Sequence, residues 1–324
     1  MQKPVWHWVG AVVCGLASAL AHAQTRDFPT RPIRVVVPTS PGGILDVVMR
    51  VVGPRMTEQI GQTIVIDNRS GASTNIGSEL VARALGDGYT LLCNSLPVVV
   101  NASLFPKLPF DVEKDFATVS LLTTSPYVVV AHPSLPAKSL KDLIALSKAR
   151  PGVINYATGG NGTNLHIATE LFKNLSGASF THVPYKGAGL GLASVVAGQT
   201  ELSFPALAAA LPQINAGRLR ALAVTSKRRS QALPGVPTVG EAGVPGYEFA
   251  SWVGIFAPAS TPAGIVTPLN GHFVKAIRSP DLVSRFAAEG TEVVASSPAE
   301  FAAFIKAEAT RWPKVIKEAN IKAE

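Results

Sequence analysis

The chain has 324 residues, about the length of two average domains. Hydrophobic residues make up 47% of the chain and charged residues 15%, which excludes an intrinsically disordered protein, because disorder requires low hydrophobicity and high charge. The net charge is +8. Only two cysteines are present, and this number excludes a disulfide-stabilised scaffold and a cysteine-based zinc or iron–sulfur site.

The N-terminus has the pattern of a secretory signal peptide. Lys3 supplies a positive charge, Val9–Leu20 is apolar, and Ala21-His22-Ala23 has the form of a cleavage site. The apolar stretch is shorter than the roughly 20 residues that a membrane-spanning helix needs. We therefore expect residues 1–23 to be removed and the mature protein to be exported in soluble form.

A lipoprotein is the alternative for this segment, with Cys14 as the lipidated residue. Val13 stands before it, where a small residue is expected, which argues against lipidation. Loss of the signal peptide leaves Cys93 as the one thiol of the mature chain, at the end of an apolar run where a buried cysteine is expected.

Short apolar segments alternate with helical patterns along the rest of the chain. This alternation predicts βαβ units whose sheets are covered by helices on both faces. The absence of a low-complexity linker predicts two α/β lobes joined by crossing strands, with the C-terminus returning to the first lobe. The expected strands are Ile33–Val37, Thr63–Ile66, Thr90–Cys93, Tyr127–Ala131, Val153–Ala157, Phe180–Val183, Glu201–Phe204 and Ala221–Thr225. The expected helices are Ile44–Ile60, Ile76–Leu85, Leu140–Arg150, Asn164–Leu175, Leu190–Ala197, Leu211–Ala216 and a C-terminal helix that begins after Ser297 and is disturbed at Pro313.

Two glycine-rich turns connect a strand to a helix, Pro38–Asp46 in the first half of the chain and Thr158–His166 in the second. Helix N-termini carry unpaired N–H groups and a partial positive charge, and glycine lets a ligand approach the backbone closely. The two turns therefore predict a binding site for a carboxylate or a dianion. The alternative is that they are ordinary strand–helix connections that need glycine for their geometry.

Sequence motifs for other chemistries are absent. Leu165 stands where the dinucleotide-binding fingerprint needs its third glycine, and the phosphate loop, nucleophile elbow and zinc-binding helix motifs do not occur. The basic run Lys227–Arg229 favours a solvated turn over a nucleic-acid site. His166 is either a packed histidine or a ligand contact, and Asp46 either stabilises the first turn of its helix or faces the ligand. We expect no catalytic residue, no metal and no cofactor.

Motifs spread over the whole mature chain resemble those of the Bug family, the extracytoplasmic receptors of tripartite tricarboxylate transporters. The matching segments are Phe28–Arg34, Pro38–Asp46, Asp67–Ala72, Asp87–Leu92, Leu108–Asp111, Asp115-Phe116, Thr158–His166, Val183–Gly187, Leu233–Thr238, Pro245–Glu248 and Trp252–Gly254.

The resemblance implies a type II periplasmic binding protein, in which two α/β lobes close on a ligand. Residues 24–127 and 247–324 would form lobe 1, and residues 128–246 lobe 2. Such a receptor is a monomer that captures a small carboxylate and delivers it to membrane permease subunits, without a cofactor. The expected ligand-binding residues are Thr39, Ser40, Gly42, Gly43, Asp46, Asn94, Ser95, Thr158, Gly159, Asn161, Gly162, Thr163, His166, Tyr185 and Phe204.

Three segments depart from the family pattern by being less polar: Leu45, Ala193-Ser194 and Phe204-Pro205. They favour a monocarboxylate, or an aromatic or aliphatic diacid, over citrate. Two alternatives to uptake stay open at this point. One is a sensory receptor that reports its ligand to a membrane kinase, and the other is an α/β enzyme.

Overall fold

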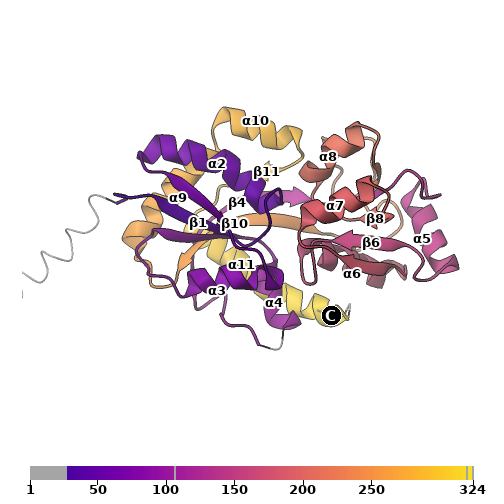
Figure 1. Ribbon diagram of the computed structural model, residues 1–324, viewed down its shortest axis with the longest axis horizontal. Coiled ribbons are helices and arrows are strands. Elements are labelled where there is room, and N and C mark those ends of the chain that lie inside the picture. The colour runs from indigo at the N-terminus through magenta and orange to yellow at the C-terminus, as the bar shows by residue number, and fades with distance from the viewer. Residues whose placement is uncertain (1–27, 106, 319, 323–324) are drawn as a thin grey trace, which may run out of the picture.

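The computed structural model describes residues 28–105, 107–318 and 320–322, so the expected signal peptide lies outside the described residues. The chain forms two α/β units that lie side by side, each built around its own sheet (Figure 1). Within the described ranges, no helix is both long and apolar enough to cross a membrane.

The first unit contains a six-stranded mixed sheet in the order β11-β4-β10-β3-β1-β2. Strands β1, β2 and β3 are parallel, whereas β10 is antiparallel to both of its neighbours, β3 and β4. The sheet is covered on one face by α2, α9 and α10 and on the other by α3, α4 and α11 (Figure 1). The strands are β1 (Ile33–Val37), β2 (Ile64–Asn68), β3 (Thr90–Asn94), β4 (Phe116–Pro126), β10 (Ala250–Pro258) and β11 (Glu292–Val293). The helices are α2 (Ile44–Ile60), η1 (Ala72–Thr74), α3 (Asn75–Ala82), α4 (Pro97–Leu104), α9 (Ala263–Ile277), α10 (Pro280–Ala288) and α11 (Pro298–Glu318).

The second unit contains a five-stranded sheet in the order β7-β6-β8-β5-β9, in which β6, β7 and β8 are parallel and β5 is antiparallel to β8 and β9. Helices α7 and α8 pack on one face, and α5 and α6 pack on the other. The strands are β5 (Val128–Ala131), β6 (Asn155–Thr158), β7 (Thr181–Pro184), β8 (Leu202–Ser203) and β9 (Arg220–Val224). The helices are α5 (Leu140–Ala149), α6 (Asn164–Ser176), α7 (Ala188–Val196) and α8 (Leu207–Asn215).

The chain crosses between the sheets twice, at Tyr127 and again before β10. Buried Thr225 ties the two crossings together, because its hydroxyl donates to the carbonyl of Phe249 at 2.7 Å and accepts the N–H of Tyr127 at 2.7 Å. The rings of Tyr127 and Phe249 also contact each other, with centroids 5.2 Å apart. The C-terminal helix packs on the first unit, as expected, and its end reaches the second unit, where Asn174 Nδ2 donates to the carbonyl of Glu318 at 3.4 Å. The expected lobe boundaries remain a prediction.

Some elements were not expected from the sequence. Strands β4 and β10 mix hydroxyl residues or glycine with apolar residues and lack a clear alternation, although both lie in the core of the sheet. Helices α4, α9 and α10 were also not expected. Helix α11 does not end at Pro313 but continues to Glu318, since Trp312 and Ile316 on either side are buried and hold it by packing.

Candidate functional site

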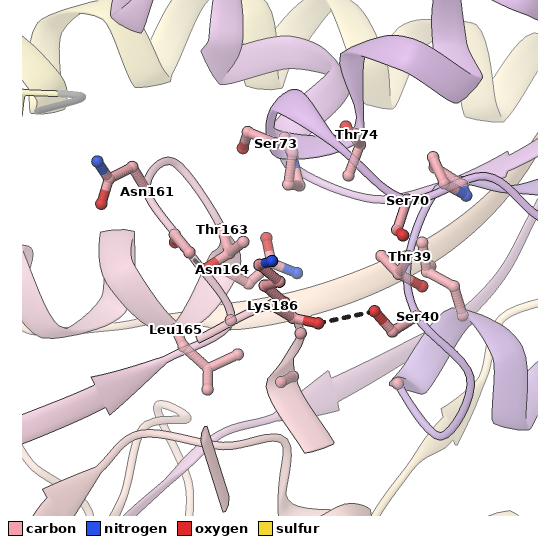
Figure 2. A pocket seen from close by; sticks show the side chains of 18 of the residues that line it. Thr39, Ser40, Ser70, Ser73, Thr74, Asn161, Thr163, Asn164, Leu165 and Lys186 are labelled. Atoms are coloured by element: carbon pink, nitrogen blue, oxygen red, sulfur yellow. Dashed lines mark hydrogen bonds between the residues drawn. The ribbon is translucent and has the colours of Figure 1, made fainter. Parts of the chain in front are cut away.

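A cavity of about 610 Å³ lies between the two units and is lined by loops from both (Figure 2). The strand ends after β1, β2 and β3 contribute one side, and those after β6 and β7 contribute the other. In α/β sheets this edge is the usual position for a ligand, because helix N-termini and connecting loops gather there.

The first glycine-rich turn, from β1 to α2, is held by the carboxylate of Asp46. This carboxylate accepts hydrogen bonds from Gly42 N at 2.9 Å, from Arg50 Nε at 2.8 Å and from Asn68 Nδ2 at 3.1 Å. Burial raises the pKa of Asp46, but these hydrogen bonds outweigh burial, and the net pKa is lowered. Asp46 is therefore an ionised group that shapes the loop from behind the cavity.

The second glycine-rich turn, from β6 to α6, is also held by its own side chains. The hydroxyl of Thr163 donates to the carbonyl of Gly160 at 2.7 Å, and the amide of Gly160 donates to Thr158 Oγ1 at 3.1 Å. Gly160 has a φ of 118° and Gly162 a φ of 71°, in the left-handed region that side chains other than glycine rarely adopt.

Three helices begin at the cavity without a side-chain cap: α2 after Gly43, α6 after Thr163 and α7 after Gly187. Their first-turn N–H groups have no acceptor within the helix, and the helix dipoles place partial positive charge at the same ends. The cavity is therefore electropositive and supplied with backbone donors. Lys186, the only charged residue among the described residues that line the cavity, is also positive.

A third loop, between β2 and α3, forms the upper wall in Figure 2. Ala72, Ser73 and Thr74 have φ values of 44°, 52° and 76°, three consecutive left-handed residues that are not glycine. Asn101 stabilises this turn by donating to the carbonyl of Ser73 at 2.6 Å. Strained backbone that persists in this way is typical of functional loops.

The two units touch each other across the cavity. Ser40 Oγ donates to the carbonyl of Lys186 at 2.9 Å, which Figure 2 shows as a dashed line. Deeper in the cleft, Asn164 Nδ2 donates to Ser95 Oγ at 3.2 Å and to Ser251 Oγ at 2.8 Å. These contacts describe a closed arrangement of the units.

The residues of the cavity wall also carry buried polar groups. The hydroxyls of Thr39 and Ser73 are buried and have no hydrogen-bond partner within the described structure. Tyr127 forms part of the wall, and burial raises the pKa of its phenol to about 12, against hydrogen bonds with Ser251 and Asn164 that lower the pKa, so the phenol is neutral. Of the described residues, no aspartate or glutamate lines the cavity.

The structure brings eight of the fifteen expected site residues to the cavity wall: Thr39, Ser40, Gly43, Ser95, Gly159, Asn161, Thr163 and Tyr185. Seven others do not line it: Gly42, Asp46, Asn94, Thr158, Gly162, His166 and Phe204.

Most of these seven support the wall from behind. Asn94 bonds Ser78 Oγ at 2.9 Å, and His166 is 3% exposed and accepts the amide of Gly162 at 3.2 Å. Phe204 is fully buried against Phe172, so the argument for a less polar cavity rests on Leu45, which does line it.

Two further segments line the cavity that were not expected there from the sequence, the loop from Ser70 to Thr74 and the segment from Lys186 to Ala188. Each follows a strand of a parallel pair, β2 and β7 respectively, so their position after a strand was the available signal. The aromatic side chain of Phe105, beyond the end of α4, carried no such signal.

Comparison with known proteins identifies a family with a similar sequence. The sequence model of the tripartite tricarboxylate transporter family receptor matches residues 48–321. Protein BugT of Bordetella pertussis (strain Tohama I) is 38% identical over 308 residues, which cover 94% of each chain.

Solved structures of similar sequence have the same fold. The R. palustris protein Rpa4515, solved with adipate, is 38% identical with a TM-score of 0.88, covering 91% of this chain and 99% of that one. MatC (Rpa3494) from Rhodopseudomonas palustris, with bound malate, is 33% identical with a TM-score of 0.86, covering 89% and 100%. The expected two-lobe α/β fold is thereby confirmed, as is the prediction of a receptor in place of an enzyme. The chain belongs to the receptor family of the tripartite tricarboxylate transporters.

Proposed function

We propose that this protein captures a small organic acid in the periplasm, in the cavity between its two α/β units, and delivers it to the permease of a tripartite transporter. The observation that carries the proposal is the meeting of three uncapped helix N-termini, α2, α6 and α7, at one cavity. Each helix end stabilises a nearby anion by about 0.3–1 kcal/mol, and a hydrogen bond to a charged group adds about 1.5–3 kcal/mol.

The composition of the wall narrows the ligand to acids without an ammonium group. An amino acid would bring a cation into a cavity whose described lining has no carboxylate and has Lys186 as its one charge. Burying an unpaired charge is costly. Apolar side chains, including Leu45, Phe105 and Leu165, leave room for an aliphatic or aromatic body. The adipate in the related Rpa4515 structure supports this class of ligand.

Export and partners are part of the same proposal. The Lys3, apolar and Ala21-His22-Ala23 pattern supports removal of residues 1–23 on export. Family membership supports permease subunits as the partners. Mass spectrometry of periplasmic protein is expected to find an N-terminus at Gln24, and an exported chain that retains Met1 would contradict the proposal.

A matched pair of ligands tests the binding class. Glutarate and glutamate have the same two carboxylates and differ by one ammonium group. The mature protein is expected to bind adipate and glutarate in calorimetry and to bind glutamate at least tenfold more weakly. Saturating ligand raises the free energy of unfolding by about 2.7 kcal/mol at 100 times the Kd, so a thermal-shift screen gives a second readout. Equal affinity for glutamate, or tight binding of citrate, would contradict the ligand class.

A further inference from the structure

Two stacked histidines lie directly behind the second glycine loop and are not part of the cavity wall. His166 comes from the first turn of α6 and His182 from β7, and their ring centroids are 4.6 Å apart with an interplanar angle of 25°. Tyr156 of β6 stacks on the other face of His182 at 4.8 Å. The three rings form a column that runs from the sheet to the loop.

Each imidazole is connected to a glycine amide of the loop. His166 Nδ1 accepts the N–H of Gly162 directly at 3.2 Å. His182 Nε2 lies 2.6 Å from Thr158 Oγ1, the same oxygen that accepts the N–H of Gly160 at 3.1 Å. The two rings therefore orient alternate amides of the loop that leads into the N-terminus of α6.

Gly162 belongs to the second unit and lies close to the first. A Cβ atom built on Gly162 would lie 2.8 Å from Ser73 Oγ of the first unit, so the loop is pressed against the opposite wall. The hydrogen bond from Gly162 to His166 holds the loop at this distance. The same residue therefore bonds His166 and lies close to the first unit.

The bond from Gly162 requires a neutral His166, because Nδ1 must keep its lone pair to accept an N–H. A proton on Nδ1 would place two donors against each other. His182 and Lys173 disfavour a proton on the ring, whereas the carboxylate of Glu170 favours one. That carboxylate also accepts hydrogen bonds from Lys173 Nζ at 2.7 Å and from the hydroxyl of Tyr156. Burial is the main cause of a lowered pKa at His166; His182 and Lys173 lower the pKa as well, the Glu170 carboxylate raises it, and the net pKa is about 4.

We propose that His166, stacked on His182, is a positioning residue that holds the second glycine loop in its ligand-binding form while its ring is neutral, and that protonation of the ring releases the loop. The effect on ligand affinity rests on the proposed function of the cavity. The hydrogen bond to the loop does not, so the two can be tested separately.

Calorimetry with adipate at pH 7.5 tests the effect on binding. His166→Leu leaves the Gly162 amide without an acceptor and is expected to weaken adipate binding about tenfold. His166→Asn places an amide oxygen near the former Nδ1 and is expected to restore affinity to within about threefold. His132→Asn is the matched control, since that ring bonds Ser134 in another part of the unit. A His166→Leu variant that binds adipate like the wild type would overturn the proposal.

Nuclear magnetic resonance of the ligand-free protein tests the loop itself. The amide resonance of Gly162 is expected to titrate with the ring of His166, with a midpoint near pH 4, and not to titrate in His166→Asn. A Gly162 amide that stays constant while the His166 ring titrates would overturn the inference. Failure of the wild type to bind adipate would count against the proposed ligand class, and the amide titration would then decide the inference alone.

Discussion

Closure of the two units depends on a glycine at position 162. All three atoms nearest to a Cβ built there belong to the first unit: Ser73 Oγ at 2.8 Å, Asn101 Oδ1 at 3.3 Å and Leu104 Cδ1 at 3.4 Å. Contacts below 3.0 Å force a neighbour to move. Gly162→Ala should therefore disfavour the closed form specifically, because an added methyl group would meet these atoms only when the units are together.

The magnitude follows from the cost of overpacking, about 1–3 kcal/mol. The lower half of this range applies, since the hydroxyl of Ser73 can rotate away. With tenfold in affinity for each 1.4 kcal/mol, we expect Gly162→Ala to weaken adipate binding roughly five- to thirtyfold in calorimetry. The left-handed backbone, with a φ of 71°, lowers the stability of the variant in the open and closed forms alike.

Gly152→Ala is the matched control for that backbone strain, with a φ of 74° and only Thr181 Oγ1 nearby, at 3.6 Å. It should destabilise the protein without weakening binding. The double variant Gly162→Ala, Ser73→Ala should bind more tightly than the two single effects predict, because it removes the colliding oxygen. Adipate binding by Gly162→Ala that is as tight as binding by Gly152→Ala would contradict this role of Gly162. Simple additivity of the effects of Gly162→Ala and Ser73→Ala would contradict it as well.

Three further predictions concern closure, the C-terminal helix and pH. In small-angle scattering, saturating adipate should reduce the radius of gyration, and an unchanged radius would contradict closure on the ligand. Glu308→Leu should lower the free energy of unfolding, measured in urea, by about 2–5 kcal/mol, because the Glu308 carboxylate accepts the indole N–H groups of Trp252 at 3.2 Å and Trp312 at 3.0 Å. Glu308→Gln keeps an acceptor and should lose less stability. Between pH 6.5 and 4, His166 takes up a proton in the unfolded chain but stays neutral in the folded protein. The free energy of unfolding should therefore fall as the pH falls, by about 3 kcal/mol in total, and by less in His166→Asn.

Much of this fold is encoded locally. The apolar runs that became β1, β3 and β5 and the helical pattern of α2 were predictable, because hydrophobic periodicity and glycine-rich turns act over a few neighbouring residues. Helix α5 begins with an equally local feature, a capping box in which Asp142 N donates to Ser139 Oγ at 3.2 Å. Strands β4 and β10 lacked such a local pattern, since their burial comes from partners far away in the chain.

The sequence by itself determined the two glycine-rich turns and, through motifs along the whole chain, the family. Only the tertiary structure decided which side chains face the cavity. The contact from Ser40 to Lys186 joins residues 146 positions apart, and nothing local to either residue indicates it. His166 turns behind its loop, and Ser73 reaches the cavity through a left-handed turn held by Asn101. A binding site between two sheets forms where distant strand ends meet, and that meeting depends on how the whole chain packs.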